Sequence, residues 1–100
     1  MSYDPRCDDP RTPSDELEDL YWRYFTATSH GLHPGCLAIA KNPNISRAML
    51  AKASIHTSAT ALNPALSLLL LEAPEWVRRN INPVVIRQAM IRQQEMKCLN

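Results

Sequence analysis

Three residues with metal-binding side chains stand close together about a third of the way along the chain. His30, His33 and Cys36 are spaced at intervals of three, and Cys7 or Cys98 could supply a fourth ligand. Zinc accepts such a mixed set of imidazole and thiolate ligands. The paired Cys-x-x-Cys spacing of zinc knuckles is absent, and the glycines and proline between these residues favour an ordinary turn. We therefore predict no metal or other cofactor, with a small metal site at the first three residues as an alternative.

The sequence contains no pattern of residues that supports catalysis. Its two glycines, Gly31 and Gly35, are too few for a phosphate-cradling loop. No serine lies in a glycine-rich nucleophile turn. Carboxylates cluster mainly between residues 4 and 19, where helix capping and solvation account for them. We predict that the protein is not an enzyme.

Five residues are candidates for binding a partner. Trp22 and Trp76 would be good anchors if they are exposed, although both could instead pack in the core. Arg78, Arg79 and Arg87 could form a basic strip that binds protein or nucleic acid. The sequence pI of about 7.8 is low for a dedicated nucleic-acid-binding protein. Protein binding is therefore our first prediction and nucleic-acid binding the alternative.

Charge is distributed unevenly along the chain. Residues 1–30 carry seven acidic side chains against three arginines, a net charge of −4, and residues 31–100 carry eight basic side chains against three acidic ones, a net charge of +5. Such polarity can steer a partner or pair two ends of a stack. Alternatively, each half simply solvates its own surface.

Size and composition are those of one folded domain. The chain has 100 residues, of which 45% are apolar and 21% charged. The first residues are polar and acidic, unlike a secretory signal, and the apolar run at 68–71 is too short to span a membrane. Three scattered cysteines do not suggest a disulfide framework. We predict a cytoplasmic protein.

The first predicted helix follows an extended acidic lead-in at residues 1–11. Thr12 is the predicted N-cap, with a proline at the first helical position. Apolar residues then recur with helical period up to about residue 29 (Leu17, Leu20, Tyr21, Tyr24 and Phe25), and Gly31 is a natural stop. Residues 12–100 are predicted to form a single domain.

Asn-Pro steps punctuate the rest of the chain. Asn42, Asn63 and Asn82 each precede a proline, at spacings of 21 and 19 residues. Proline forces the previous helix to end, and the asparagine can cap the next one. These three residues are therefore predicted structural caps, and their near-regular spacing indicates a helical repeat.

Two segments resemble the repeats of the leucine-rich repeat variant family. Residues 39–53 (IAKNPNISRAMLAKA) and 61–76 (ALNPALSLLLLEAPEW) each place a small or apolar pair before Asn-Pro and a leucine-containing helix after it. The resemblance implies a right-handed solenoid of alternating α- and 3₁₀-helices over about residues 34–90. One branch of the family carries a cysteine-rich iron–sulfur segment before its repeats. Cys7 stands alone here, so that cofactor is not implied.

Together these observations predict an all-α protein. We expect a short solenoid-like stack of helical repeats with a long N-terminal capping helix and a C-terminal helix. The predicted function is a non-catalytic adaptor, inhibitor or accessory subunit that binds another protein, or a second copy of itself, through its helical surface. A nucleic-acid-binding accessory protein and a small metal-binding domain are the alternatives.

Overall fold

Helices account for all the regular structure in the part of the chain that the computed structural model describes, residues 3–28 and 33–98. Within these residues there is no strand, which confirms the predicted all-α class. The α-helices are α1 (Ser14–Thr28), α2 (Pro34–Ala40), α3 (Arg47–His56), α4 (Pro64–Glu72), α5 (Pro74–Asn80) and α6 (Pro83–Cys98), and two 3₁₀-helices are η1 (Pro5–Cys7) and η2 (Ser58–Leu62).

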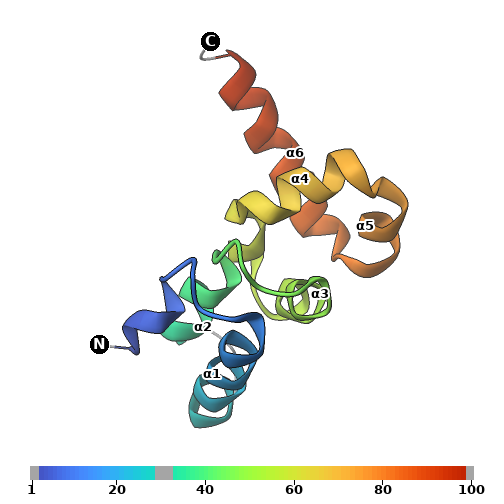
Figure 1. Cartoon of the computed structure of the whole chain (residues 1–100). Helices are drawn as coiled ribbons and strands as arrows, with labels where there is room; N and C mark the ends of the chain where they lie inside the picture. The colour runs from blue at the N-terminus through green and yellow to red at the C-terminus, as the bar shows by residue number, and fades with distance from the viewer. Residues whose placement is uncertain (1–2, 29–32, 99–100) are drawn as a thin grey trace.

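The N-terminal helices lie at one end of the molecule and α4, α5 and α6 at the other (Figure 1). The first helix, α1, packs against α2, and η1 contacts both. The short η2 lies at the centre, where it contacts α2, α3, α4 and α6. At the other end α4, α5 and α6 pack together, and the C-terminal turns of α6 extend beyond the other helices. None of the described helices is both long enough and apolar enough to cross a bilayer.

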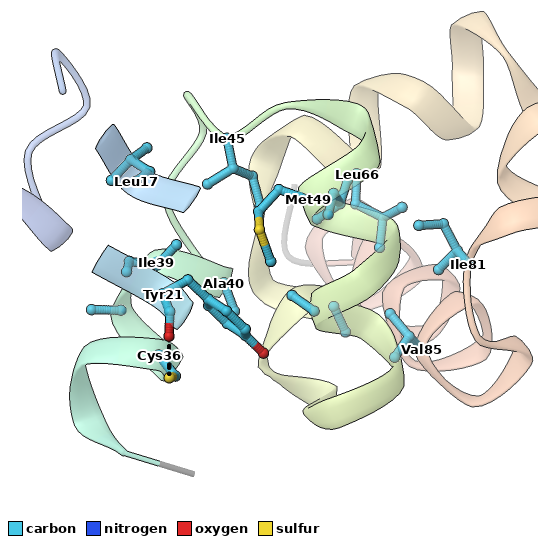
Figure 2. Close-up of a cluster of buried hydrophobic side chains, with 14 of the residues drawn as sticks. Leu17, Tyr21, Cys36, Ile39, Ala40, Ile45, Met49, Leu66, Ile81 and Val85 are labelled. Atoms are coloured by element: carbon cyan, nitrogen blue, oxygen red, sulfur yellow. Dashed lines mark hydrogen bonds between the residues drawn. The ribbon is translucent and has the colours of Figure 1, made fainter. Parts of the chain in front are cut away.

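One hydrophobic core runs through both ends of the molecule. Tyr21 of α1 and Met49 of α3 are fully buried, as is Leu66 of α4, and Val85 of α6 is nearly so. Figure 2 shows the buried side chains as a row that extends from Leu17 through Met49 to Val85. A single shared core of this kind couples the stability of the two ends.

The prolines start helices and turns by one recurring local geometry. In six X-Pro steps the side chain before proline accepts a hydrogen bond of 2.9 Å from the backbone N–H two residues later. These pairs are Asp4 with Arg6, Asp9 with Arg11, His33 with Gly35, Asn42 with Asn44, Asn63 with Ala65, and Asn82 with Val84. Proline has no N–H of its own, so the N–H that follows it is the first one needing an acceptor. The Asp-Pro and His-Pro steps therefore use the same geometry as the three Asn-Pro steps.

Two of the asparagines also connect X-Pro turns that are distant in the sequence, through their amide nitrogens. The Nδ2 of Asn42 donates to the carbonyls of Cys7 and Asp9, both at 2.9 Å. The Nδ2 of Asn63 donates to the carbonyls of Ala40, at 2.9 Å, and of Asn42, at 2.8 Å. In both cases the acceptors are two residues apart, and the second acceptor is itself the residue before a proline. The X-Pro turns at Asp9, Asn42 and Asn63 are thus joined by hydrogen bonds from two buried asparagines, and we call these bonds the amide ladder.

Two of the predicted caps have other roles in the structure. The α1 helix begins at Ser14, and the hydroxyl of Thr12 donates to the carbonyl of Arg6 at 2.8 Å. Asn42 precedes a turn, and the N-cap of α3 is Ser46, whose Oγ accepts from the N–H of Met49 at 3.1 Å. The hydroxyl of Thr12 is used in a hydrogen bond to an earlier turn, and the Oδ1 of Asn42 accepts from Asn44 within a turn that ends before α3 begins. By contrast, the side chains of Asn63 and Asn82 accept from the first free N–H groups of α4 and α6.

The acidic lead-in is also folded rather than extended. It contains η1, and Cys7 at the end of η1 is fully buried in the core. The backbone N–H of Asp4 donates to the hydroxyl of Tyr24 at 2.7 Å, and this bond fixes the lead-in against α1. The acidic composition did not predict this, because Cys7 is the one buried residue among residues 3–11 and the carboxylates stay at least partly exposed.

Candidate functional site

The candidate metal ligands have structural roles in the described part of the chain. His33 is the N-cap of α2, with its Nδ1 accepting from Gly35, and its ring stacks on Tyr24 with centroids 4.4 Å apart. Cys36 is fully buried, and its Sγ donates to the carbonyl of Tyr21 at 3.5 Å (Figure 2). His30 lies outside the described residues. Among the residues that the structure describes, no three His, Cys, Asp or Glu side chains gather as a metal site would require.

The two buried thiols are poor nucleophiles. Burial raises the pKa of Cys36 to about 11. Burial, together with the nearby carboxylates of Asp4 and Asp8, raises the pKa of Cys7 to about 11. A thiol must lose its proton to attack a substrate or bind a metal tightly. Both side chains therefore act as small core residues at neutral pH.

The two tryptophans are half-buried and pack against the core. Trp22 makes edge contacts with the rings of Tyr21 and Phe25, at centroid distances of 5.2 and 5.3 Å, and reaches toward His56 at 6.3 Å. Trp76 packs on the core beneath the guanidinium of Arg47, which is 5.8 Å from the ring centroid. Both tryptophans therefore lie at the edge of the core, and each side chain is only partly exposed.

The three candidate arginines do not form one strip. Arg78, Arg79 and Arg87 are all exposed. Arg78 of α5 and Arg87 of α6 line the same surface depression, together with Met90, whereas Arg79 does not. Arg78 lies 3.6 Å from the carboxylate of Glu75, an exposed pair of the kind that contributes little to stability. The structure therefore separates Arg79 from the other two.

The sequence analysis missed a set of exposed apolar side chains in the second half of the molecule. Leu71 of α4 is 78% exposed and Met90 of α6 is 54% exposed. Further large exposed apolar residues of this half are Leu62, Leu68, Val84 and Ile91. One signal was present in the sequence, because residues 64–72 hold five leucines, more than one face of a short helix can bury.

Four of these side chains, Leu62, Leu71, Met90 and Ile91, line a groove along α6. A depression of about 310 Å³ between α4, α5 and α6 is lined by Leu70, Leu71, Arg78, Ile86, Met90 and Gln93, with Pro74 and Val77. A neighbouring depression shares Arg78, Ile86 and Met90 and adds Arg87, and another shares Leu71 and Gln93 and adds Leu62 and Arg92. We call these three adjoining depressions the α6 groove.

The chemistry of the α6 groove suits binding. Its described lining consists of apolar, amide, hydroxyl and guanidinium groups, and none of those residues is a carboxylate, histidine or cysteine. No acid–base pair or nucleophile activated by a neighbouring base is present among them. Comparison of the chain with protein-family models, with curated proteins and with solved structures finds no match.

Proposed function

We propose that this protein is a non-catalytic interaction module that binds another protein through the α6 groove. The observation that carries the proposal is the exposure of large apolar side chains on both walls of the groove, above all Leu71 and Met90. Contiguous exposed apolar surface flanked by polar groups is typical of protein-binding sites. Burying these two side chains against a partner would contribute about 25 cal/mol for each Å² of apolar surface removed from water.

The amide ladder supports a repeat architecture of the leucine-rich repeat variant kind. Asn42 and Asn63 each donate to two backbone carbonyls of an earlier X-Pro turn. Asn42 reaches back 33 residues to Asp9 and Asn63 reaches back 21 residues to Asn42, so the two spacings differ but the local contact is the same. A local contact that is made again in this way is what stacked units of a solenoid produce. We therefore propose that the chain is a short stack of such units, with α1 at its first end.

The two ends of such a stack differ in their outer surfaces, and this difference indicates where a partner binds. A terminal repeat needs a polar outer face to remain soluble. At the first end the exposed side of α1 carries acidic residues, including Asp15 and Glu16. At the other end α4 and α6 present Leu71 and Met90. A partner that covers this end would supply the polar outer face that the chain itself lacks.

Affinity capture with matched variants tests the proposal. The double variant Leu71→Gln/Met90→Gln removes the apolar walls without adding charge, and Ile55→Gln changes an equally exposed side chain outside the groove. Because these positions are exposed, each single change should alter stability by no more than about 0.5 kcal/mol. We expect a protein from the source cell to be retained by the wild type and by Ile55→Gln and to be lost with the double variant. Equal retention by all three forms would contradict the proposal.

The double variant Leu71→Gln/Met90→Gln, compared with an arginine variant, also distinguishes nucleic-acid binding from protein binding. Phosphate binding depends on cationic side chains and falls steeply with salt. Leu71→Gln/Met90→Gln should leave it unchanged, whereas Arg78→Gln/Arg87→Gln should weaken it. Recovery of nuclease-sensitive material that follows the second pattern would favour this alternative. Stoichiometric zinc in the purified protein would favour the metal alternative.

A further inference from the structure

The walls of the α6 groove carry positive charge and apolar surface together. Arg78 and Arg87 lie on one side, and Arg92 lies toward the other, next to Leu62. All three are exposed, and the ion pair of Arg78 with Glu75 is the one that the described residues form with any of them. None of the described residues lining the groove is acidic. A ligand that fits this surface combines an apolar stripe with negative charge.

The form of the ligand follows from what the groove lacks. An extended peptide is usually held by pairing with a sheet edge, and the described chain has no strand. A polyproline segment usually needs an aromatic-lined groove, and no aromatic ring is among the lining residues described. An amphipathic helix, with apolar anchors at i, i+3 or i+4, and i+7, is the common mode that would use the apolar walls of the groove as well as its arginines. Leu71 and Met90 would receive those anchors.

We propose that the α6 groove binds an acidic amphipathic helix of a partner protein. This inference rests on the proposed function and names the class of its partner. The helix lies along α6 with its apolar stripe on Leu71 and Met90, and its flanking carboxylates face Arg78 and Arg87. Charge complementarity of this kind sets the choice of partner and speeds association more than it raises affinity.

A second copy of this chain does not satisfy the groove. A symmetric pairing of two grooves would bring the arginines of both copies into one interface with no carboxylate among its described lining, and such a gathering of like charges is costly. The chain does contain an acidic amphipathic helix, α1, but its apolar residues Leu17 and Leu20 are already buried in the core. The acidic helix therefore comes from a different protein.

Peptide binding to the full-length chain tests this inference. The probe is a fluorescently labelled helical peptide of about 18 residues, five turns, with leucines along one stripe and glutamates beside it. One control peptide has lysines in place of the glutamates, and another has serines in place of the leucines. Fluorescence anisotropy should show the acidic peptide binding at least about tenfold more tightly than either control, a difference of about 1.4 kcal/mol.

Charge reversal in the protein makes the test specific to the groove. Arg78→Glu/Arg87→Glu should reverse the preference, so that the lysine peptide binds more tightly than the glutamate peptide. The control Lys41→Glu/Arg79→Glu makes the same change in net charge at exposed residues that do not line the groove, and it should shift either affinity less than about twofold. Leu71→Gln/Met90→Gln should weaken the acidic peptide about tenfold or more. Circular dichroism establishes that each variant is folded.

Each contrary result has a distinct meaning. Equal binding of the glutamate and lysine peptides would overturn the inference that the partner is acidic. It would still identify the groove as a binding site. Equal binding of the serine peptide would show plain charge attraction and overturn the inference. A concentration-dependent dimer abolished by Leu71→Gln/Met90→Gln would identify a second copy as the occupant instead. Binding to vesicles of phosphatidylglycerol and phosphatidylcholine without peptide binding would identify a membrane surface. The capture experiment above decides the proposed function independently of all four.

Discussion

The two halves of the molecule differ in how many large apolar side chains they leave exposed. In residues 3–56 the described side chains bury nearly all of their large apolar groups, and Ile55 is the one exposed exception. In residues 57–94 large apolar side chains on η2, α4 and α6 remain in solvent. Charge follows the same division. Five ion pairs of the described chain lie in the first half, and one, between Arg78 and Glu75, lies in the second.

The first half buries nearly all of its large apolar side chains, whereas the second half leaves apolar surface exposed. The first half is closed by the amide ladder and by polar contacts of the lead-in, such as the hydrogen bond from Asp4 to Tyr24. These contacts satisfy groups that would otherwise be buried without partners. The second half shares the same core but leaves several leucines and arginines exposed to solvent. Under the proposed function, association with a partner would cover this exposed surface.

The largest predicted contrast lies within one helix, α4. Leu66 is fully buried and Leu71 is 78% exposed. We expect Leu66→Ala to lower the free energy of unfolding by about 4 kcal/mol, through lost burial and a residual cavity, and Leu71→Ala to change it by less than about 0.5 kcal/mol. Urea denaturation of the isolated chain measures both. A large loss in the free energy of unfolding with Leu71→Ala would show that Leu71 is a core residue and does not line the groove.

The amide ladder gives the next contrast. Asn63→Asp keeps the acceptor for Ala65 but replaces the two buried Nδ2 donor bonds with a carboxylate facing two carbonyls. We expect a cost of about 3 kcal/mol at neutral pH. Asn82→Asp should be close to neutral, because Asn82 is less buried and aspartate is an equally good N-cap for α6.

Equal effects of these two asparagine substitutions in chemical denaturation would contradict the role of the ladder. They would show that both residues act only as local caps. The comparison is well matched because each substitution exchanges an amide for an isosteric carboxylate after the same kind of turn.

The smallest predicted effect is a pH dependence in the lead-in. Hydrogen bonds from the side chain and backbone of Arg6 lower the pKa of Asp4 from 3.8 to about 2. A carboxyl whose folded pKa is lowered stabilises the fold above its unfolded pKa and loses that contribution as pH falls toward the folded value. Between about pH 4 and pH 2, stability should therefore fall less steeply in Asp4→Asn than in the wild type. An NMR titration of the Asp4 carboxyl that gave a midpoint near 4 would contradict the geometry at η1.

Much of the local structure could be read from the sequence. Each Asn-Pro step marks a boundary, because proline restricts the residue before it and cannot donate a hydrogen bond. These are short-range effects that do not depend on the rest of the fold. The sequence did not indicate that Asp9 belongs to the same series, because its partner in the ladder, Asn42, lies 33 residues away.

The candidate site was harder to predict. Five leucines in residues 64–72 give no clear helical period, so the pattern cannot say that Leu66 is buried while Leu71 is exposed. Likewise, adjacent arginines look equivalent in sequence. Arg78 lines the groove and Arg79 does not, because neighbouring positions on a helix differ by about 100° in direction.

The sequence by itself determined that this protein is all-α, where most of its helices begin, and that its two ends differ in charge. Those properties follow from local backbone preferences and from composition. The tertiary structure alone decided that Asn42 and Asn63 join turns distant in the sequence and that His33 and Cys36 have structural roles. It also decided that Leu71, Met90, Arg78 and Arg87 share one groove. Contacts of this kind depend on which helix faces are covered, and that is settled only when distant segments pack together.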